Sequence, residues 1–315
     1  MLAIAAGLPA NFGAPILLVQ HIGAHRSCLP ELLSRRGPNP ARFATSGDVL
    51  KPGTIYVAPS DHHMVIEDGR IHILRGPKEH HARPAINPLF RSAALEYGPR
   101  AVGIVLTGLL DDGTVGLKAI KECGGVAVVQ TPSDAREPSM PWSALENVDV
   151  DHVATIQDMP ALLCRLVEHR ADGPAVERPS GLRIEHAALL GDSKMEDLRT
   201  IAAPSAFTCP DCGGTLFELN DKRPVRFLCH TGHAYSLRSL ASTQEEVTET
   251  ALWASVRALQ EKEAVLRRMA EVQAGEKPGG ESAAIGEADE LAKVLSVLRR
   301  FAEQTPSNKS FNTRP

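Results

Sequence analysis

The stretch that most constrains the fold is segment 101–124, AVGIVLTGLLDDGTVGLKAIKECG. It opens with an apolar run, Ala101 to Leu106, of the length and β-branched content typical of a strand buried on both faces. Two adjacent acids follow, Asp111 and Asp112, and then a helical pattern that ends at Gly124. In open parallel α/β sheets, ligands and catalytic groups collect at such strand-to-helix turns. Either acid is therefore a candidate for chemistry, or else a cap of the helix that follows.

Composition narrows the class of protein. The 315 residues are 43% hydrophobic, which is enough for a substantial core. A net charge of -4 at pH 7 argues against nucleic-acid binding. No apolar run approaches the roughly 20 residues that span a bilayer, so no membrane insertion is expected. The six cysteines are irregularly spaced and do not suggest a disulfide framework, which favours a cytoplasmic protein.

A second strand also ends on a titratable group. Residues 15–20, PILLVQ, read as a buried strand, and His21 follows it directly. Histidine suits proton transfer near neutral pH, although a histidine after a strand is more often structural. Across residues 1–169, strands alternate with helical patterns such as Asn87–Tyr97. This alternation predicts an α/β fold: a doubly wound, mostly parallel sheet with helices on both faces.

Four further histidines lie in or after a β-rich passage that runs from Arg42 to Leu74. A zinc site needs ligands at a recurring spacing, with cysteine or carboxylate partners. Neither is present here, so we interpret these histidines as incidental loop residues. They are His62, His63, His80 and His81.

Several motifs occur in the order seen in CheB-type protein-glutamate methylesterases of bacterial chemotaxis. They are Gln20-His21, segment 51–59 (KPGTIYVAP), Arg83-Pro84, segment 106–113 (LTGLLDDG) and Met140-Pro141. Residues 1–168 therefore resemble the catalytic domain of that family. The resemblance implies hydrolysis of glutamate methyl esters on chemoreceptor helices, deamidation of glutamine at the same kind of site, and no catalytic cofactor. It also implies methylated chemoreceptor helices as partners, alongside a methyltransferase or other chemosensory proteins.

The resemblance further implies a Ser-His-Asp triad. By position, His21 matches the histidine of the family and Asp112 matches its aspartate. His21 would then act as base and afterwards as acid, while Asp112 orients the imidazole and stabilises its charged form. Backbone amides near Leu109 would help to hold the oxyanion. We expect the neighbouring Asp111 to face solvent or to cap the following helix.

The nucleophile of the family has no counterpart in this sequence. Family members begin with a strand and a G-x-S-x-G-G turn, whereas this chain opens with LAIAAGLP, which resembles the tail of the following helix. We expect the first strand and the nucleophilic serine to be missing, either because the chain start was placed too late or because this is a shortened paralogue. Ester hydrolysis by the chain as written is then expected to be poor or nil. The serines that lack a strand-turn-helix context are Ser27, Ser46, Ser60, Ser92, Ser139 and Ser143.

The sequence contains no segment that could supply a receiver domain ahead of the esterase-like region. We therefore expect no regulation by an attached receiver, unless the receiver too was lost upstream. This leaves a second class of function open. The alternative to an enzyme is a non-catalytic signalling adaptor, which would bind partners through the esterase fold and the C-terminal module. An upstream G-x-S-x-G-G in the same reading frame would favour the enzyme, and a genuine start at Met1 would favour the adaptor.

A module rich in cysteine and histidine follows a linker predicted at residues 170–206, in which residues 194–201 read as a short helix. Tetrahedral zinc takes four such ligands, so a structural zinc ribbon is predicted at residues 207–240. A redox C-x-x-C is disfavoured because it would leave the second Cys/His pair unexplained. His230 is the substitute if the second half of the site closes differently. The expected ligands are Cys209, Cys212, Cys229 and His233.

Two long amphipathic patterns complete the chain. Residues 243–273 and 284–304 carry apolar side chains at helical spacing, and the turn Lys277–Gly280 separates them. The pattern predicts a helical hairpin over residues 243–304. Its ordinary role is to bury one arm against the other, and the alternative is dimerisation or docking to a partner. Residues 305–315 are polar and are predicted to be a disordered tail.

Overall fold

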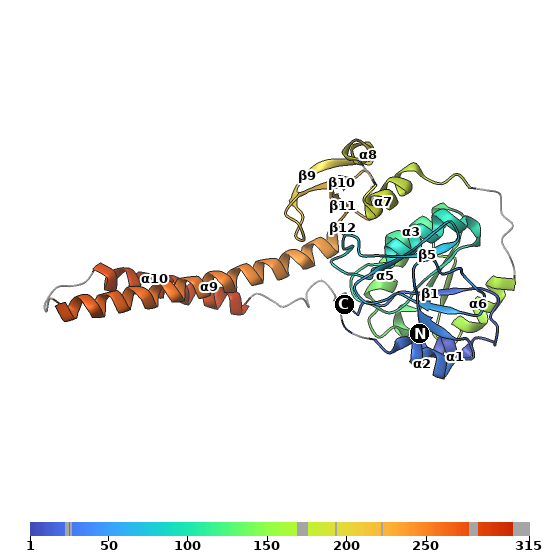
Figure 1. Cartoon of the computed structure of the whole chain (residues 1–315), viewed down its shortest axis with the longest axis horizontal. Coiled ribbons are helices and arrows are strands. Elements are labelled where there is room, and N and C mark those ends of the chain that lie inside the picture. Colours follow the sequence, from blue (N-terminus) through green and yellow to red (C-terminus); the bar gives the residue numbers. More distant parts are fainter. Residues whose placement is uncertain are drawn as a thin grey trace. The chain divides into compact units, whose positions relative to one another are not determined.

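The structure is a computed structural model that divides into two compact units, Met1–Leu240 and Ala241–Pro315 (Figure 1). The polar tail at 305–315, the turn at 277–280 and the first part of the predicted linker lie outside the described residues. Among the described residues, no helix combines the length and the apolar character needed to cross a membrane. The structure describes residues 1–22, 25, 27–168, 176–192, 194–221, 223–276 and 283–304.

Two three-stranded parallel sheets form the centre of the first unit. Their strand orders are β1-β3-β2 and β6-β7-β8. Every pairing within them is parallel, as the alternation of strand and helix predicts. Within the described residues no ladder joins β1 to β6, so the single sheet that was expected is divided into two. The strands are β1 (Ile16–Leu18), β2 (Ala41–Phe43), β3 (Ile55–Val57), β6 (Val102–Val105), β7 (Val126–Gln130) and β8 (His152–Ala154).

Helices cover both faces of these sheets. Side chains alternate between the two faces of a strand. Val105 and Val129 accordingly pack in a cluster with α4 and α5, whereas Val128 packs with α6 and the residues that follow α1. The helices are α1 (Leu2–Gly7), α2 (Leu29–Arg36), α3 (Ile86–Tyr97), α4 (Thr114–Glu122), α5 (Ser139–Asn147) and α6 (Met159–Glu168).

The antiparallel hairpin of β4 (His63–Glu67) and β5 (Arg70–Leu74) packs on α3 through a shared apolar cluster. The structure differs from the expected linker in the region that follows α6. Residues 180–190 form α7 (Ser180–Leu190), which buries Leu182, Ala188 and Leu189 and ends at Gly191, where φ is +84°. The apolar face of this helix is short and is flanked by proline and glycine, so the sequence reads as a linker. The short helix expected next is present as α8 (Met195–Ile201).

An antiparallel sheet of four strands follows and belongs to the first unit. It begins at residue 202, five residues before the predicted start of the ribbon. Its strand order is β12-β11-β10-β9, and its apolar side chains pack against α7 and α8. The strands are β9 (Ala202–Thr208), β10 (Thr215–Leu219), β11 (Arg226–Cys229) and β12 (Ala234–Ser236). We call this sheet the ribbon.

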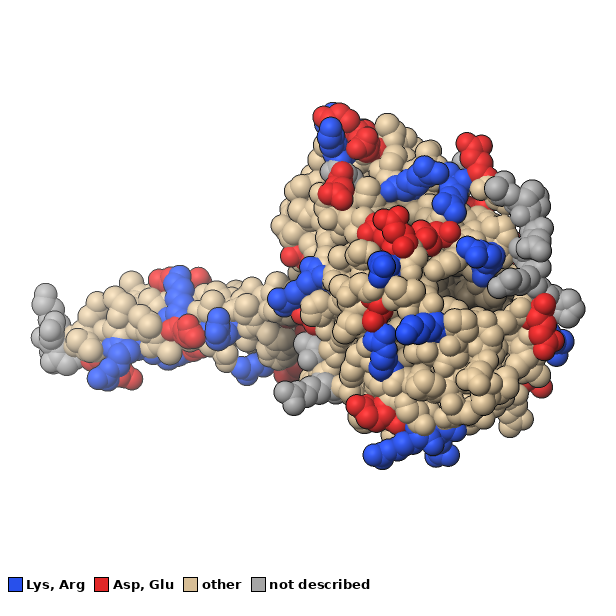
Figure 2. Space-filling model, turned by 45° about the vertical axis from the view of Figure 1, so that its right-hand side comes forward, with Lys and Arg blue, Asp and Glu red and all other residues tan. Residues whose placement is uncertain are grey.

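The second unit contains the predicted hairpin, formed by α9 (Leu237–Glu276), which begins in the first unit, and α10 (Ala283–Gln304). Ion pairs join the arms, with 2.8 Å between Lys262 Nζ and Glu287 Oε1. Both arms also leave apolar side chains exposed, and uncharged surface extends along them in Figure 2. Dimerisation through this hairpin stays a prediction. On the face drawn in Figure 2, basic and acidic side chains are interspersed, which gives nucleic acid no continuous basic surface there.

Candidate functional site

His21 and Asp112 meet at the carboxyl ends of β1 and β6. His21 Nε2 lies 2.6 Å from Asp112 Oδ2. The side chain of His21 is 37% exposed, whereas that of Asp112 is 4% exposed. Within the described residues, the second ring nitrogen of His21, Nδ1, makes no hydrogen bond. The sequence therefore named two residues that the fold brings together, and one nitrogen of the imidazole stays free for proton transfer.

Asp112 is fixed by backbone amides as well as by His21. Its Oδ2 accepts a hydrogen bond from the amide of Ile86 over 2.7 Å, and its Oδ1 accepts from the amide of Asn87 over 3.1 Å. Ile86 and Asn87 are the first residues of α3, so the carboxylate lies at the positive end of that helix. Asp112 was a candidate cap for the following helix, and its Oδ1 does accept from the amide of Gly113, just before α4, over 2.8 Å. It also binds the N-terminus of the preceding helix. Its orientation is set before any substrate arrives.

The side chain of Asn87 supports the same turn from the other side. Asn87 Oδ1 accepts hydrogen bonds from the amides of Gly113 and Gly116, over 3.0 and 2.8 Å. It thereby caps α4, just as Asp112 caps α3. These hydrogen bonds connect the N-terminus of α3 to the N-terminus of α4. The turn that contains Asp112 lies between the two. No local sequence pattern indicates this role of Asn87, because its partners lie more than twenty residues away along the chain.

Charge stabilises both partners in their ionised forms. Burial alone would lower the pKa of His21, but the hydrogen bond to Asp112 and the negative charge of Asp112 raise it above its ordinary value. Burial would raise the pKa of Asp112, yet the hydrogen bond and charge of His21 hold that pKa well below its usual range. An imidazole that gains a proton here is therefore stabilised by a carboxylate that stays ionised, as a general base requires.

The turn that precedes Asp112 depends on a close approach to α5. A Cβ on Gly108 would lie 2.0 Å from Met140 Sδ, so only glycine fits there. The amide of Met140 also donates to the carbonyl oxygen of Gly108 over 2.9 Å. Leu109 is exposed, and within the described residues its amide has no acceptor, as an oxyanion donor requires. The segments 106–113 and 140–141 are therefore in contact in the fold.

None of the serines considered from the sequence reaches His21 among the described residues. Ser139 Oγ donates to the carbonyl oxygen of Leu110, and Ser143 is buried against Thr114. Ser92 donates to the carbonyl oxygen of Leu89, and Ser60 to that of His25. These hydroxyls serve local structure, in agreement with their lack of a strand-turn-helix context.

Asp111 is not where the sequence predicts it. It is buried and does not face solvent, and no side-chain hydrogen bond from it caps α4. Its Oδ1 lies 3.3 Å from Nδ1 of His80, whose side chain is 6% exposed. Burial opposes a charge on His80, but Asp111, Asp112 and Glu79 together raise its pKa to about 9. A second His–Asp pair therefore adjoins the first, and the interpretation of Asp111 as solvent-facing or capping is wrong.

The interpretation of the loop histidines as incidental is also wrong in part. His63 is fully buried in β4, where its Nε2 lies 2.9 Å from the carbonyl oxygen of Pro77. His80 joins Asp111, and His81 Nδ1 lies 3.1 Å from Asp211 Oδ1 of the ribbon. A metal site at these histidines was not expected. The metal-capable group found among the described residues lies elsewhere, in the ribbon.

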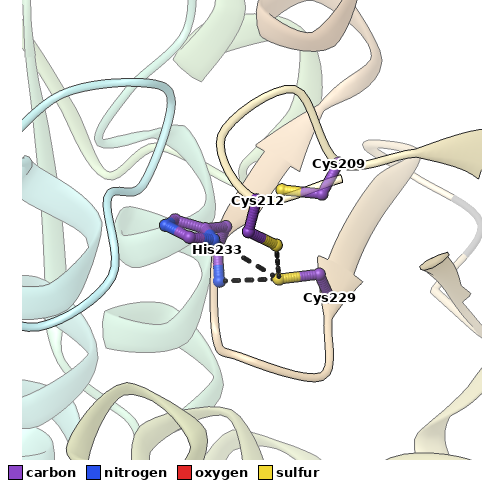
Figure 3. Close-up of side chains that lie close together, drawn as sticks. All are labelled: Cys209, Cys212, Cys229 and His233. Carbon is purple, nitrogen blue, oxygen red and sulfur yellow. Dashed lines mark hydrogen bonds between the residues drawn. The ribbon is translucent and has the colours of Figure 1, made fainter. Parts of the chain in front are cut away.

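Four donor side chains of the ribbon converge as the sequence predicts (Figure 3). Their ligand atoms all lie within 4.8 Å of one another. Two of the contacts are 3.8 Å between the sulfurs of Cys212 and Cys229, and 3.5 Å between Cys229 Sγ and His233 Nδ1. His230, the expected substitute, is not in this group. The donors are Cys209, Cys212, Cys229 and His233, a set that suits tetrahedral zinc.

Comparisons with known proteins find relatives of the first half of the chain. A family model described as CheB methylesterase matches residues 1–163. A "Putative protein-glutamate methylesterase/protein-glutamine glutaminase" of Leptospira interrogans is 37% identical over 171 residues, covering 52% of this chain and 86% of the relative. A protein of Pyrococcus abyssi named protein-glutamate methylesterase/protein-glutamine glutaminase is 37% identical over 174 residues, covering 53% of this chain and 47% of the relative.

A solved structure agrees with these relatives. The CheB methylesterase catalytic domain of Thermotoga maritima superimposes with a TM-score of 0.50 at 29% sequence identity, covering 52% of this chain and 90% of that chain. The residues matched by the family model make up more than half of this sequence and include both His21 and Asp112. The resemblance found in the ordered motifs is thus confirmed, and the chain belongs to the CheB methylesterase family.

Proposed function

We propose that this chain carries the His–Asp part of an esterase site that hydrolyses glutamate methyl esters on chemoreceptor helices. The observation that carries the proposal is the 2.6 Å contact between His21 Nε2 and Asp112 Oδ2 at adjoining strand ends. His21 would accept the proton of a serine hydroxyl and later donate it to the methoxide oxygen, which departs as methanol. Water would then release the glutamate carboxylate by the same route. A glutamine side chain would lose ammonia in place of methanol.

The surroundings of the pair suit a protein substrate. Leu109, in the turn before Asp112, and Trp142, in α5, are exposed apolar side chains on neighbouring elements, 51% and 47% exposed. An amphipathic receptor helix would contact such side chains while its ester enters the site. The free amide of Leu109 would stabilise the oxyanion that forms on the ester carbonyl.

The two parallel sheets also suggest where the nucleophile belongs. In the described residues, β1 pairs only with β3, and β6 pairs only with β7. Both strands nevertheless contribute to one apolar cluster, through Ile16 on β1 and Ile104 on β6. A strand that ends in a nucleophile turn would find unpaired backbone groups on β1 and β6. Its serine would then lie at the same edge as His21 and Asp112.

The test combines two measurements on protein purified from its native cells. One is the intact mass, and the other is methanol release from a methylated chemoreceptor fragment. We expect a mass above 33.8 kDa together with methanol release that a His21→Gln variant lacks. A mass of 33.8 kDa without methanol release would replace the enzyme by the signalling adaptor. Methanol release that survives His21→Gln would remove this pair from the chemistry.

For the ribbon, we propose one structural zinc ion bound by Cys209, Cys212, Cys229 and His233. Four protein ligands leave no position open for substrate, so the ion would stabilise the fold and take no part in hydrolysis. An N–H to sulfur hydrogen bond supports the site, since the amide of His233 donates to Cys229 Sγ over 3.3 Å. Such outer contacts orient ligands and stabilise the thiolate.

Elemental analysis of the purified protein tests the ion. We expect about one zinc per chain in the wild type and less than a tenth of that in Cys212→Ser. The matched control is Cys28→Ser, because Cys28 and Cys212 are both exposed and only Cys212 belongs to the donor group. Wild-type protein without zinc, or full zinc content in Cys212→Ser, would contradict the assignment.

A further inference from the structure

Strand β12 of the ribbon pairs with a segment of the esterase fold that belongs to no named strand. The amide of His80 donates to the carbonyl oxygen of Ala234 over 2.8 Å, and the amide of Ala234 donates to the carbonyl oxygen of Lys78 over 3.3 Å. Between them, Glu79 and Ala234 form a parallel bridge. Asp211 of the C-x-x-C knuckle adds an ion pair with Lys78, 3.6 Å from Nζ to Oδ1. The segment 78–80 therefore lies along the edge of the ribbon.

Buried ion pairs anchor this segment on both sides. Glu79 is buried and accepts two hydrogen bonds from Arg91 of α3, over 3.2 and 2.8 Å. Arg91 Nη1 lies 3.6 Å from Glu185 Oε2 of α7. Glu185 in turn accepts two hydrogen bonds from Arg226 of β11, over 2.6 and 2.9 Å. A chain of charges thus joins α3, α7 and the ribbon beside the residue that precedes His80.

His80 connects the ribbon edge to the turn that carries Asp112. Its backbone is bonded to Ala234, and its ring reaches Asp111 on one side. On the other side, His80 Nε2 lies 2.9 Å from Asn87 Nδ2. Asn87 binds the amide of Gly113, and its own amide binds Asp112. A short route through Asp111 therefore leads from β12 to the turn that carries Asp112. A protonated His80 makes no hydrogen bond to Asn87, because Nδ2 of Asn87 is also a donor.

The backbone at both ends of this contact is held in an unusual conformation. His80 and His81 have φ of +53° and +57°, and Leu110 has φ of +61°. Residues other than glycine rarely adopt a positive φ. Such conformations persist where surrounding contacts hold them, and they gather at functional sites. Here they lie at both ends of the contact between His80 and Asp111.

We propose that His80 is a positioning residue of the esterase site: the ribbon holds it against Asp111, and this contact keeps Asp112 in register with His21. The importance of that register for hydrolysis rests on the proposed function, but the positioning itself does not. The ribbon then contributes to the esterase site, because its last strand, β12, supports the turn that contains Asp112.

The test follows His21 and the backbone of the turn by NMR in the full-length chain, so its outcome does not depend on hydrolysis. The variants are His80→Gln and Asp111→Asn, which each remove one partner. The control is His72→Gln, since His72 lies in β5 away from the contact. We expect the pKa of His21 to fall in both variants, because a loosened Asp112 stabilises the imidazolium less. We also expect about tenfold faster exchange of the Gly113 amide, as one weakened hydrogen bond allows.

The direction of the change separates positioning from simple charge. The positive charge of His80 lowers the pKa of His21, so loss of that charge with an unmoved Asp112 would raise it. A rise in His80→Gln, or no change in either variant, would overturn the proposal, and so would an equal fall in His72→Gln. If His80→Gln fails to fold, the exchange rate of the Gly113 amide in Asp111→Asn decides. The pKa of His21 does not decide in that variant, because loss of the Asp111 charge lowers it without any movement of Asp112.

The role of the ribbon in holding His80 can be tested in the wild type, without any variant. In the wild type, the His80 amide is bonded to Ala234 of β12. We therefore expect it to exchange with solvent as slowly as the amides of β11, within about tenfold. Exchange as fast as that of an exposed loop amide would show that the ribbon does not hold His80. Methanol release plays no role in this result, so failure of the proposed function would not be mistaken for failure of the positioning.

Discussion

Two His–Asp pairs of the molecule have aspartates that are neighbours in one turn. The two histidine side chains differ in their exposure to water. His21 is 37% exposed at its side chain and bonds Asp112 over 2.6 Å. The side chain of His80 is 6% exposed, and it lies 3.3 Å from Asp111 without an aligned hydrogen bond. An accessible imidazole can exchange its proton with a substrate, whereas an enclosed one can hold only charge and position. The same two residue types thus suit proton transfer in the exposed pair and structural support in the buried pair.

The largest difference should be in hydrolysis. In the protein purified from native cells, we expect Asp112→Asn to lower methanol release by about 10⁴-fold, because the imidazole loses the carboxylate that orients it. Asp111→Asn should lower it by only about tenfold, through the looser turn. Initial rates on a methylated receptor fragment measure both. Equal losses in the two variants would abolish the distinction between the pairs.

The next difference should be in the free energy of unfolding. His80→Gln leaves Asp111 as a buried carboxylate without its cation, which costs about 3–5 kcal/mol. His21→Gln removes a partly exposed partner, and Asp112 keeps its backbone donors, so we expect a loss of about 1 kcal/mol or less. Urea denaturation at pH 7 compares the two identical substitutions. A larger loss for His21→Gln would reverse the assignment of support to His80.

The buried pair should also leave a signature in the dependence of stability on pH. Its environment raises the pKa of His80 from 6.5 to about 9. The unfolded chain therefore loses this proton before the folded chain does. The pair contributes fully below pH 6.5, and about 3 kcal/mol disappears as the pH rises to 9. The lowered pKa of Asp112 acts in the opposite direction, since its contribution is lost as the pH falls.

Denaturation curves of the wild type and Asp111→Asn, taken between pH 6 and 9.5, isolate this effect. The wild type should lose about 3 kcal/mol more than the variant across that window. Groups that titrate elsewhere in the chain are common to both proteins and cancel in the difference. Parallel curves would mean that His80 is neutral in the folded state, and would remove the charge from the buried pair.

The elements that the sequence predicts well are those that depend on local patterns. The apolar runs before His21 and Asp112 are strands β1 and β6, and the amphipathic spacing before Tyr97 is α3. The rule that functional groups collect at strand carboxyl ends, together with the ordered motifs, brought His21 and Asp112 forward as a pair. The structure places their side chains in contact. Periodicity was sufficient for the strands because each apolar run directly precedes the turn that carries the group. The pairing of His21 with Asp112 came from the family resemblance carried by the ordered motifs.

The features that the sequence did not predict depend on contacts between distant segments. Asp111 turns inward because His80 meets it there, and His80 is held by Ala234 of β12. No local pattern connects these residues. Helix α7 was hidden for a different reason, since Pro179 and Gly191 delimit a short apolar face within a region rich in turn residues. Support for a site is therefore harder to infer from sequence than the site itself.

The smallest effect concerns the backbone that presents both carboxylates. Leu110, directly before Asp111, has φ of +61°, a conformation that costs an L-residue about 1 kcal/mol and costs glycine almost nothing. Leu110→Gly and Leu110→Ala both remove the half-buried side chain, so their difference reports the backbone alone. We expect Leu110→Gly to be more stable than Leu110→Ala by about 1 kcal/mol in urea denaturation. If Leu110→Ala is the more stable, the turn does not hold Leu110 in this conformation, and the two pairs do not share a constrained backbone.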